Sequence, residues 1–146
     1  MIAPTRNAAV IGESLPPLEH HFTQVALVAY GAATWDWHRL HYDLDYARSK
    51  NLPGTLVDGQ AFGALFARVV QDWAGPRAFI TRLSFKMKSM AFAGDTLVAS
   101  GAVTAVRETP QGMVVTLAQR LMNGERLAAD AVTEVRLPAE TLNKSV

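Results

Sequence analysis

The clearest hydrophobic pattern in the sequence lies between residues 59 and 73. Apolar side chains recur there every three or four residues, which is the spacing of one face of an α-helix: Phe62, Leu65, Phe66, Val69, Val70 and Trp73. Asp58 stands directly before this segment as a candidate N-cap, and Gly75-Pro76 follows it as a stop signal. The pattern predicts one long helix, and small residues beside its apolar face allow a sheet to approach closely.

A different pattern, with a period of two, begins directly after the helix. Over residues 79–88, one set of side chains alternates with a largely polar set, as expected for a half-buried β-strand. Three more strands are predicted, over residues 96–107, 112–122 and 126–137. Hairpin turns separate them at Thr109-Pro110-Gln111-Gly112 and Asn123-Gly124. One helix followed by four antiparallel strands predicts an α+β domain in which the helix packs on the sheet.

The first part of the chain is less regular. Residues 22–31 form an apolar run that predicts a buried strand, and residues 34–45 follow as a polar, aromatic segment without a clean period. Residues 1–19 contain several turn-forming residues, and we expect an irregular arm there with a short strand near Ala9–Ile11. Because no repeat or low-complexity linker interrupts the sequence, we expect a single domain over residues 1–146.

Composition narrows the class of protein. Apolar residues make up 49% of the 146 residues and charged residues 18%, which is typical of a globular domain. The formal net charge is +1 and the sequence has no basic cluster, so a nucleic-acid partner is not expected. The lack of cysteine excludes disulfides, a cysteine nucleophile and zinc held by thiolates, and is compatible with the reducing cytoplasm. We find neither a signal peptide nor a run of about 18 apolar residues, so we expect a cytoplasmic protein without a membrane partner.

The segment from Asp36 to Asp43 concentrates chemically active side chains, namely two histidines and two carboxylates. Asp36 and His41 are five residues apart, so a turn between them would aim both side chains into one cleft. A carboxylate and an imidazole held together activate water, because one takes its proton and the other handles the second proton transfer. Solvated loop charges are the alternative interpretation. His38 and His41 also have a His-x-x-His spacing with Asp36 nearby, but a third firm metal ligand is not evident, and no metal is expected.

The same segment resembles the signature of the MaoC-like (R)-specific enoyl-CoA hydratase/dehydratase family, which reads here Asp36 … His41-Tyr42-Asp43 … Ala47. The predicted helix begins with Leu56-Val57-Asp58-Gly59, which resembles the family's apolar-apolar-His-Gly sequence with Asp58 in place of the histidine. A motif that opens strands in hotdog domains is similar to Gly94-Asp95-Thr96-Leu97. The resemblance covers residues 22–137 and implies a single hotdog domain, an antiparallel curved sheet wrapped around one long central helix.

The resemblance also implies a reaction and the residues that carry it. Asp36 and His41 would activate water for addition to a trans-2-enoyl-CoA, or run the reverse dehydration of a 3-hydroxyacyl thioester. Gly59 would offer its N–H, at the positive end of the helix, to the thioester oxygen on which negative charge develops. An acyl-CoA thioester is therefore the expected substrate, and no cofactor is expected.

Three further residues are candidate substrate contacts. Asp58 is a second carboxylate beside the predicted site, although a helix cap alone explains its position. His38 lies between the two candidate catalytic residues in the sequence. Arg39 would meet the phosphates of CoA or form a surface ion pair.

Hotdog domains usually pair, so a homodimer or a heteromer with another hotdog chain is expected. Residues 72–76 and 103–106 resemble the small subunit of heteromeric MaoC-like hydratases that act on steroid side-chain CoA thioesters. Two alternatives remain open. One is a hotdog acyl-CoA thioesterase, which usually places an acidic residue on or near the central helix, where Asp58 and Asp72 qualify. The other is a non-catalytic, acyl-binding subunit whose partner supplies the site.

Overall fold

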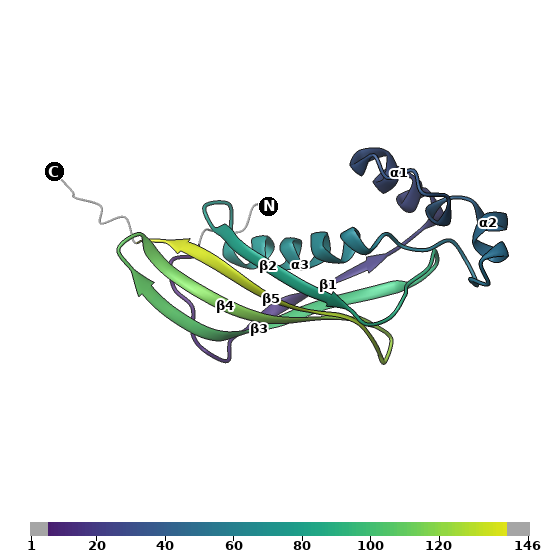
Figure 1. Ribbon diagram of the computed structural model, residues 1–146. Coiled ribbons are helices and arrows are strands. Elements are labelled where there is room, and N and C mark those ends of the chain that lie inside the picture. The colour runs from purple at the N-terminus through teal and green to yellow at the C-terminus, as the bar shows by residue number, and fades with distance from the viewer. Residues whose placement is uncertain (1–5, 140–146) are drawn as a thin grey trace.

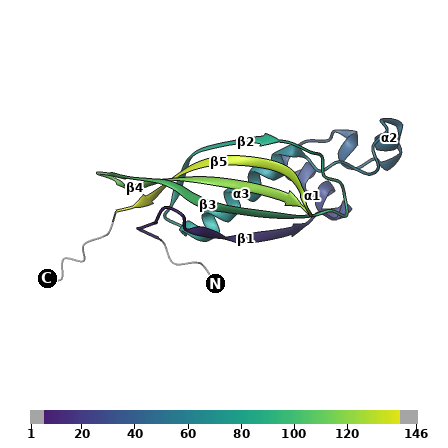
Figure 2. The same ribbon diagram turned by 90° about the horizontal axis from the view of Figure 1, so that it is seen from below.

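The computed structural model describes residues 6–139, which form a five-stranded antiparallel sheet that curves around one long helix (Figure 1). The strands are β1 (Ser14–His21), β2 (Phe79–Met87), β3 (Thr96–Thr109), β4 (Gly112–Asn123) and β5 (Arg126–Pro138). The helices are α1 (Gln24–Thr34), the 3₁₀ helix η1 (Arg39–His41), α2 (Leu44–Ser49) and α3 (Gly59–Ala74). The strand order is β1-β3-β4-β5-β2, and α3 lies against one face of this sheet (Figure 2). The predicted α+β architecture is confirmed.

Helix α3 forms where the periodic pattern predicts it. Asp58 is the N-cap and accepts a hydrogen bond from the Gln60 N–H at 2.8 Å, and Gly75 ends the helix with a positive φ of 85°. The apolar face is buried and contacts all five strands. Gly63 allows close approach to the sheet, because a Cβ atom there would lie 2.8 Å from the Phe85 ring. Helix α3 is thus fixed in place along its length, and so is its N-terminus.

The core between α3 and the sheet contains one buried polar chain of hydrogen bonds. Gln119 on β4 donates from Nε2 to the Phe66 carbonyl at 3.0 Å, and Thr133 on β5 donates to Gln119 Oε1 at 2.6 Å. Gln119 and Thr133 are both almost fully buried. Because each side chain finds a partner, their burial carries little penalty. The apolar remainder of the core closes around these groups: Phe62, Phe66, Val69, Val70, Leu97, Leu117, Leu121, Val135 and Leu137.

The last four strands match the predicted ranges, but their arrangement differs from a simple meander. Strand β2 pairs with β5 and lies at the far edge of the sheet, so it does not pair with β3, which follows it in sequence. The register shifts between Ile80 and Arg82, and this irregularity breaks the alternation predicted for residues 79–88. As a result Ile80, Leu83 and Phe85 pack against the core, whereas Phe79 is 60% exposed.

Two predictions for the N-terminal part are wrong. Residues 24–34 form helix α1 where a strand was expected, since a short apolar run does not distinguish the two, and Thr23 caps the helix by accepting from the Ala26 N–H at 3.0 Å. Of the expected irregular arm, residues 1–5 lie outside the described residues and residues 6–13 are irregular, but the remainder belongs to strand β1, and Ala9–Ile11 is not a strand. Pro16 and Pro17 fit in β1 because it is an edge strand whose register shifts between Leu15 and Leu18.

Helices α1 and α2 lie together at the end of the molecule where α3 begins (Figures 1 and 2). They and η1 carry the segment with the candidate catalytic residues. Within residues 6–139, no helix has the length and hydropathy needed to cross a membrane.

Candidate active site

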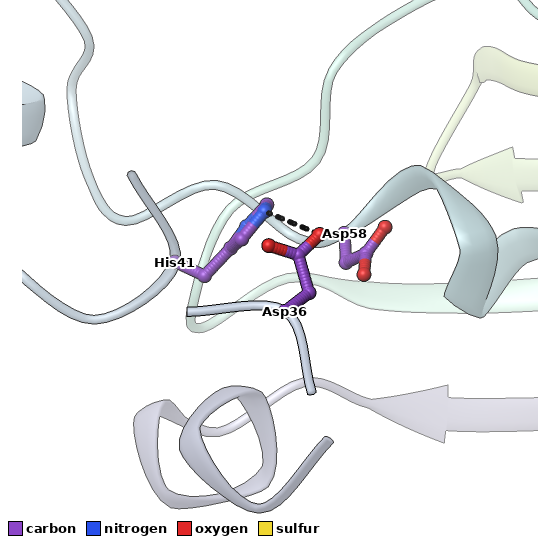
Figure 3. A group of neighbouring side chains, drawn as sticks. All are labelled: Asp36, His41 and Asp58. Atoms are coloured by element: carbon purple, nitrogen blue, oxygen red, sulfur yellow. Dashed lines mark ion pairs between the residues drawn. The ribbon is translucent and has the colours of Figure 1, made fainter. Parts of the chain in front are cut away.

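Asp36, His41 and Asp58 come together at the N-terminal end of α3 (Figure 3). Asp36 follows α1, His41 closes η1, and Asp58 is the N-cap of α3. His41 Nε2 lies 4.0 Å from Asp36 Oδ2, and one carboxylate oxygen of Asp58 lies within 4.8 Å of the ligand atoms of both. The structure therefore brings the predicted pair together and adds a second carboxylate to it.

The end of helix α1 positions Asp36. Trp35 adopts a left-handed conformation with φ 61°, and the N–H groups of both Trp35 and Asp36 point to the Gly31 carbonyl, the latter at 3.0 Å. A Cβ atom on Gly31 would lie 2.7 Å from the Asp36 carbonyl oxygen, so only glycine fits there. The His38 N–H donates to Asp36 Oδ1 at 3.1 Å. This leaves Asp36 Oδ2 directed at His41.

The imidazole of His41 is oriented from its other side. Its Nδ1 atom lies 2.7 Å from the Leu56 carbonyl oxygen, which is only an acceptor, so Nδ1 must carry the hydrogen. In the neutral ring Nε2 is then the bare, basic nitrogen, and it faces Asp36. The His41 side chain is 13% exposed and that of Asp36 is 33% exposed. The pair is thus partly shielded, and its base is directed into the site.

The first residues of α3 supply two more polar groups. Asp58 Oδ1 caps the helix through Gln60, while Asp58 Oδ2 is buried and accepts no hydrogen bond from residues 6–139. The Gly59 N–H takes part in none of the hydrogen bonds found in this described part of the chain. A Cβ atom on Gly59 would run into the thioether of Met87. Among the described residues, the positive end of the α3 dipole therefore has one donor and one acceptor that make no hydrogen bond.

The three side chains Asp36, His41 and Asp58 are all of types that ligate metals, so their spacing is compared with that of zinc ligands and with that of groups sharing one water. Two ligands of a tetrahedral zinc ion at about 2.1 Å lie about 3.4 Å apart. The Asp36 and His41 atoms are 4.0 Å apart. Two partners of one water, each at about 2.8 Å, lie about 4.6 Å apart at a tetrahedral angle. The observed 4.0 Å lies midway between these two spacings, so the pair is compatible with a shared water molecule.

An apolar pocket of about 270 Å³ adjoins the three residues. Its walls come from β1, α1 and the start of α3, and the apolar lining includes Phe22, Ala26, Leu27, Val57 and Ala61. His41 and Asp58 lie at its edge. A larger, more open depression of about 860 Å³ crosses the strands near Ser84 and Arg120, but none of the candidate site residues lines it. We therefore associate the chemistry with the smaller pocket.

His38 and Arg39 lie in the same turn, but their side chains make other contacts. His38 caps η1 by accepting from the Leu40 N–H at 3.3 Å. Arg39 pairs with Asp43 at 2.7 Å, and its guanidinium stacks on Tyr46. The hydrogen bond to Asp43 raises the pKa of Arg39, and the Tyr46 N–H, followed by Arg39, lowers the pKa of Asp43. The surface ion pair considered for Arg39 is therefore present.

Two pocket residues, Tyr30 and His20, are absent from the predicted site. Burial raises the pKa of the Tyr30 hydroxyl above its usual value, and the Asp58 carboxylate raises it further, so Tyr30 stays a neutral donor beside the pocket. The sequence contains a weak signal for this wall, because the buried Leu27 and Gly31 are four residues apart, as on one helical face. The prediction of a strand over residues 22–31 does not use that spacing.

Comparison with known proteins assigns this chain to a family. A family model described as "Hydroxyacyl-thioester dehydratase type 2" matches residues 6–93. This match spans more than half of the chain and includes every candidate site residue. The chain belongs to the hydroxyacyl-thioester dehydratase type 2 family. Among its relatives, the chain is 33% identical over 99 residues to the 3-oxo-4,17-pregnadiene-20-carboxyl-CoA hydratase beta subunit of Mycobacterium tuberculosis. That alignment covers 68% of this chain and 77% of the relative.

Solved structures of similar proteins agree with this family assignment. A chain of the ChsH1–ChsH2 complex from Mycobacterium tuberculosis superposes with a TM-score of 0.82 at 28% identity, covering 89% of this chain and 99% of that one. An (R)-hydratase from Aeromonas caviae involved in PHA biosynthesis also superposes with a TM-score of 0.82, at 27% identity, covering 91% and 100%. This member of the hydroxyacyl-thioester dehydratase type 2 family is thus a MaoC-like hotdog domain, as the sequence resemblance implies.

Proposed function

We propose that this protein hydrates a trans-2-enoyl-CoA, or dehydrates the corresponding 3-hydroxyacyl thioester, with Asp36 and His41 as the catalytic pair. The observation that carries the proposal is the 4.0 Å approach of His41 Nε2 to Asp36 Oδ2 near the start of α3, where the Gly59 N–H makes no hydrogen bond within residues 6–139. Membership of a hydratase/dehydratase family of hotdog proteins supports it. The fixed Nδ1–H of His41 supports it as well, because it leaves the basic nitrogen on the side of the carboxylate.

In the proposed hydration, the pair handles both proton transfers. The oxygen of water bonds to C3 of the enoyl group while one of its protons passes to the pair. The pair then returns a proton to C2, so no proton is gained or lost overall. Dehydration is the reverse of these steps.

Gly59 is proposed to stabilise the intermediate. As water adds to C3, negative charge moves through C2 to the thioester oxygen. A backbone N–H at the positive end of α3 would bind that oxygen, and removing such a donor typically costs about 100-fold or more in rate. The free state of the Gly59 N–H within residues 6–139 supports this role.

The pocket beside the pair supports an acyl substrate. A water molecule occupies about 30 Å³ of liquid, and a methylene group is of similar size, so 270 Å³ has room for about nine such groups. The contacts of Arg39 with CoA phosphates and of His38 with substrate stay predictions. In the structure, the Arg39 side chain pairs with Asp43. Substitution of Arg39 or His38 by alanine is the direct test of each contact.

A second hotdog chain is the proposed partner. The similar structure of the ChsH1–ChsH2 complex contains two kinds of chain, and the relative from the same organism is a beta subunit. Among residues 6–139, β2 lies at a sheet edge with a neighbour on one side only. Either a homodimer or a heteromer would satisfy this edge.

The thioesterase alternative finds less support in the site. Asp72 pairs with Arg68 at 2.7 Å on the surface of α3, and its side chain is 51% exposed. Asp58 is the one remaining acidic residue that was considered for that reaction, and it lies beside a carboxylate–imidazole pair. Measuring both loss of the enoyl thioester and release of free CoA separates the two reactions.

The experiment compares wild-type protein with Asp36→Asn and His41→Asn, assayed alone and together with any hotdog chain that co-purifies. We expect the hydration rate to fall by about 100-fold or more in each variant while circular dichroism stays unchanged. Near wild-type rates in both variants would show that the pair is not catalytic. Inactivity of the wild-type chain even with its partner, or activity that depends only on the partner's residues, would favour a non-catalytic subunit.

A further inference from the structure

Only one of the two carboxylate oxygens of Asp58 accepts a hydrogen bond from residues 6–139. Its Oδ1 atom accepts the Gln60 N–H at 2.8 Å, which is the whole of the N-cap interaction. Its Oδ2 atom is buried and accepts no hydrogen bond from any residue between 6 and 139. Buried carboxylate oxygens almost always have a partner, because an unpaired one is costly. The unused oxygen therefore points to a ligand of this site.

The position of Asp58 identifies that ligand by its size and chemistry. One carboxylate oxygen of Asp58 lies within 4.8 Å of a carboxylate oxygen of Asp36 and of a ring nitrogen of His41. Groups that share one hydrogen-bonded water at a tetrahedral angle lie about 4.6 Å apart. A single water molecule is thus within reach of all three side chains, and an oxygen that only accepts is suited to one of its O–H groups.

We propose that Asp58 is a third catalytic residue, which holds the reacting water through Oδ2. The water donates one O–H to Asp58 and the other to the Asp36–His41 pair. The pair takes the second proton as the water oxygen bonds to C3, and the O–H held by Asp58 remains in the hydroxyl group of the product. In dehydration, Asp58 binds the same O–H of the departing hydroxyl. This role rests on the proposed function and adds orientation of the water to it.

The N-cap function of Asp58 allows a sharp test, because Ser and Asn are equally good N-caps. Asp58→Ser keeps one oxygen for Gln60 but lacks the second. Asp58→Asn keeps the cap oxygen but turns an NH₂ donor toward the water. We expect kcat for hydration to fall about 10- to 100-fold in both variants, with a smaller change in KM and with Tm near that of the wild type. Asp58→Ala should lower kcat and Tm together.

The matched control is Asp72→Asn, which removes an exposed carboxylate from the same helix and should leave kcat unchanged. Wild-type kcat in Asp58→Ser and Asp58→Asn would overturn the role proposed here and leave Asp58 as a helix cap. If Asp36→Asn is inactive in the same assay, the proposed function stands even so. If Asp36→Asn keeps the wild-type rate, the proposed function fails first.

Discussion

The Nδ1 atom of His41 lies 2.7 Å from the main-chain oxygen of Leu56, two residues before the N-cap of α3. This contact joins the short helix η1 to the start of the central helix. It fixes which nitrogen of the ring is basic, and it holds that nitrogen beside Asp36. The orientation of the base is therefore a property of the fold and does not depend on the bound substrate.

This contact predicts different outcomes for two substitutions of His41. In His41→Asn, the amide NH₂ can replace Nδ1 as the donor to Leu56, so the hydrogen bond survives while the basic nitrogen is lost. In His41→Ala both are lost, which should cost about 1 kcal/mol in the free energy of unfolding, or about 2–4 °C in Tm. In thermal melts, the Tm of the wild type and of His41→Asn should be higher than that of His41→Ala, whereas hydration assays should find both variants equally inactive. A Tm of His41→Asn as low as that of His41→Ala would contradict the proposed role of the contact.

Gly31 should be intolerant of even one added methyl group. Its Cβ would meet the Asp36 carbonyl oxygen at 2.7 Å, and a backbone atom of a turn moves less easily than a side chain. We expect Gly31→Ala to destabilise the fold by about 1–3 kcal/mol and to lower the hydration rate at least 10-fold by displacing Asp36. Urea unfolding and initial rates measure the two effects. Ala33→Ser, an exposed change on the same helix, should alter neither.

The pocket wall should set the length of the acyl tail. Ala26 lines the pocket from α1, and Ala26→Phe would fill much of the 270 Å³. We expect kcat/KM for long-chain enoyl-CoA to fall about 10-fold or more, while the value for the shortest enoyl-CoA changes little. Ala33→Phe places the same bulk on an exposed part of α1 outside the pocket and serves as the control. An equal loss for all chain lengths would place the tail elsewhere.

Glu13 should make the fold more stable at neutral pH than in acid. The Trp73 indole N–H, at 3.0 Å, is the main cause that holds the pKa of Glu13 below its usual value, although partial burial opposes it. A lowered folded-state pKa stabilises the protein above the unfolded pKa, near 4.5, and this contribution is lost as pH falls through the folded value. The stability difference between wild type and Glu13→Gln should therefore be largest near neutral pH and vanish in acid. Denaturant titrations at several pH values measure it, and a constant difference would contradict the prediction.

The sequence was informative where local patterns act alone. The helical period predicted α3 together with its cap at Asp58, and strong turn signals located the hairpins that join β3 to β5. The five-residue spacing of Asp36 and His41 anticipated their approach, because a single turn joins them. Their catalytic roles remain predictions until variants are assayed.

What the sequence did not predict depends on contacts between distant segments. Strand β2 pairs with β5, although β3 and β4 separate the two in the sequence, so no local pattern records this pairing. The buried Oδ2 of Asp58, which has no hydrogen-bond partner within residues 6–139, belongs to a side chain that lies beside Asp36 and His41 from an earlier segment of the chain. The apolar run of residues 22–31 fits a strand and a helix equally well, and the packing of Leu27 and Gly31 decides for the helix.

The close packing at Gly31 has a consequence for how this protein can change. Helix α1 forms one wall of the pocket, and its last turn also holds the backbone of Asp36. A mutation that shifts the axis of α1 to admit a different tail would also move the carboxylate away from His41. New substrate range is therefore more accessible through side chains on the opposite wall, such as Phe22 and Ala61, than through rearrangement of α1. Engineering of the proposed acyl specificity would best begin there, with the backbone between Gly31 and Asp36 left untouched.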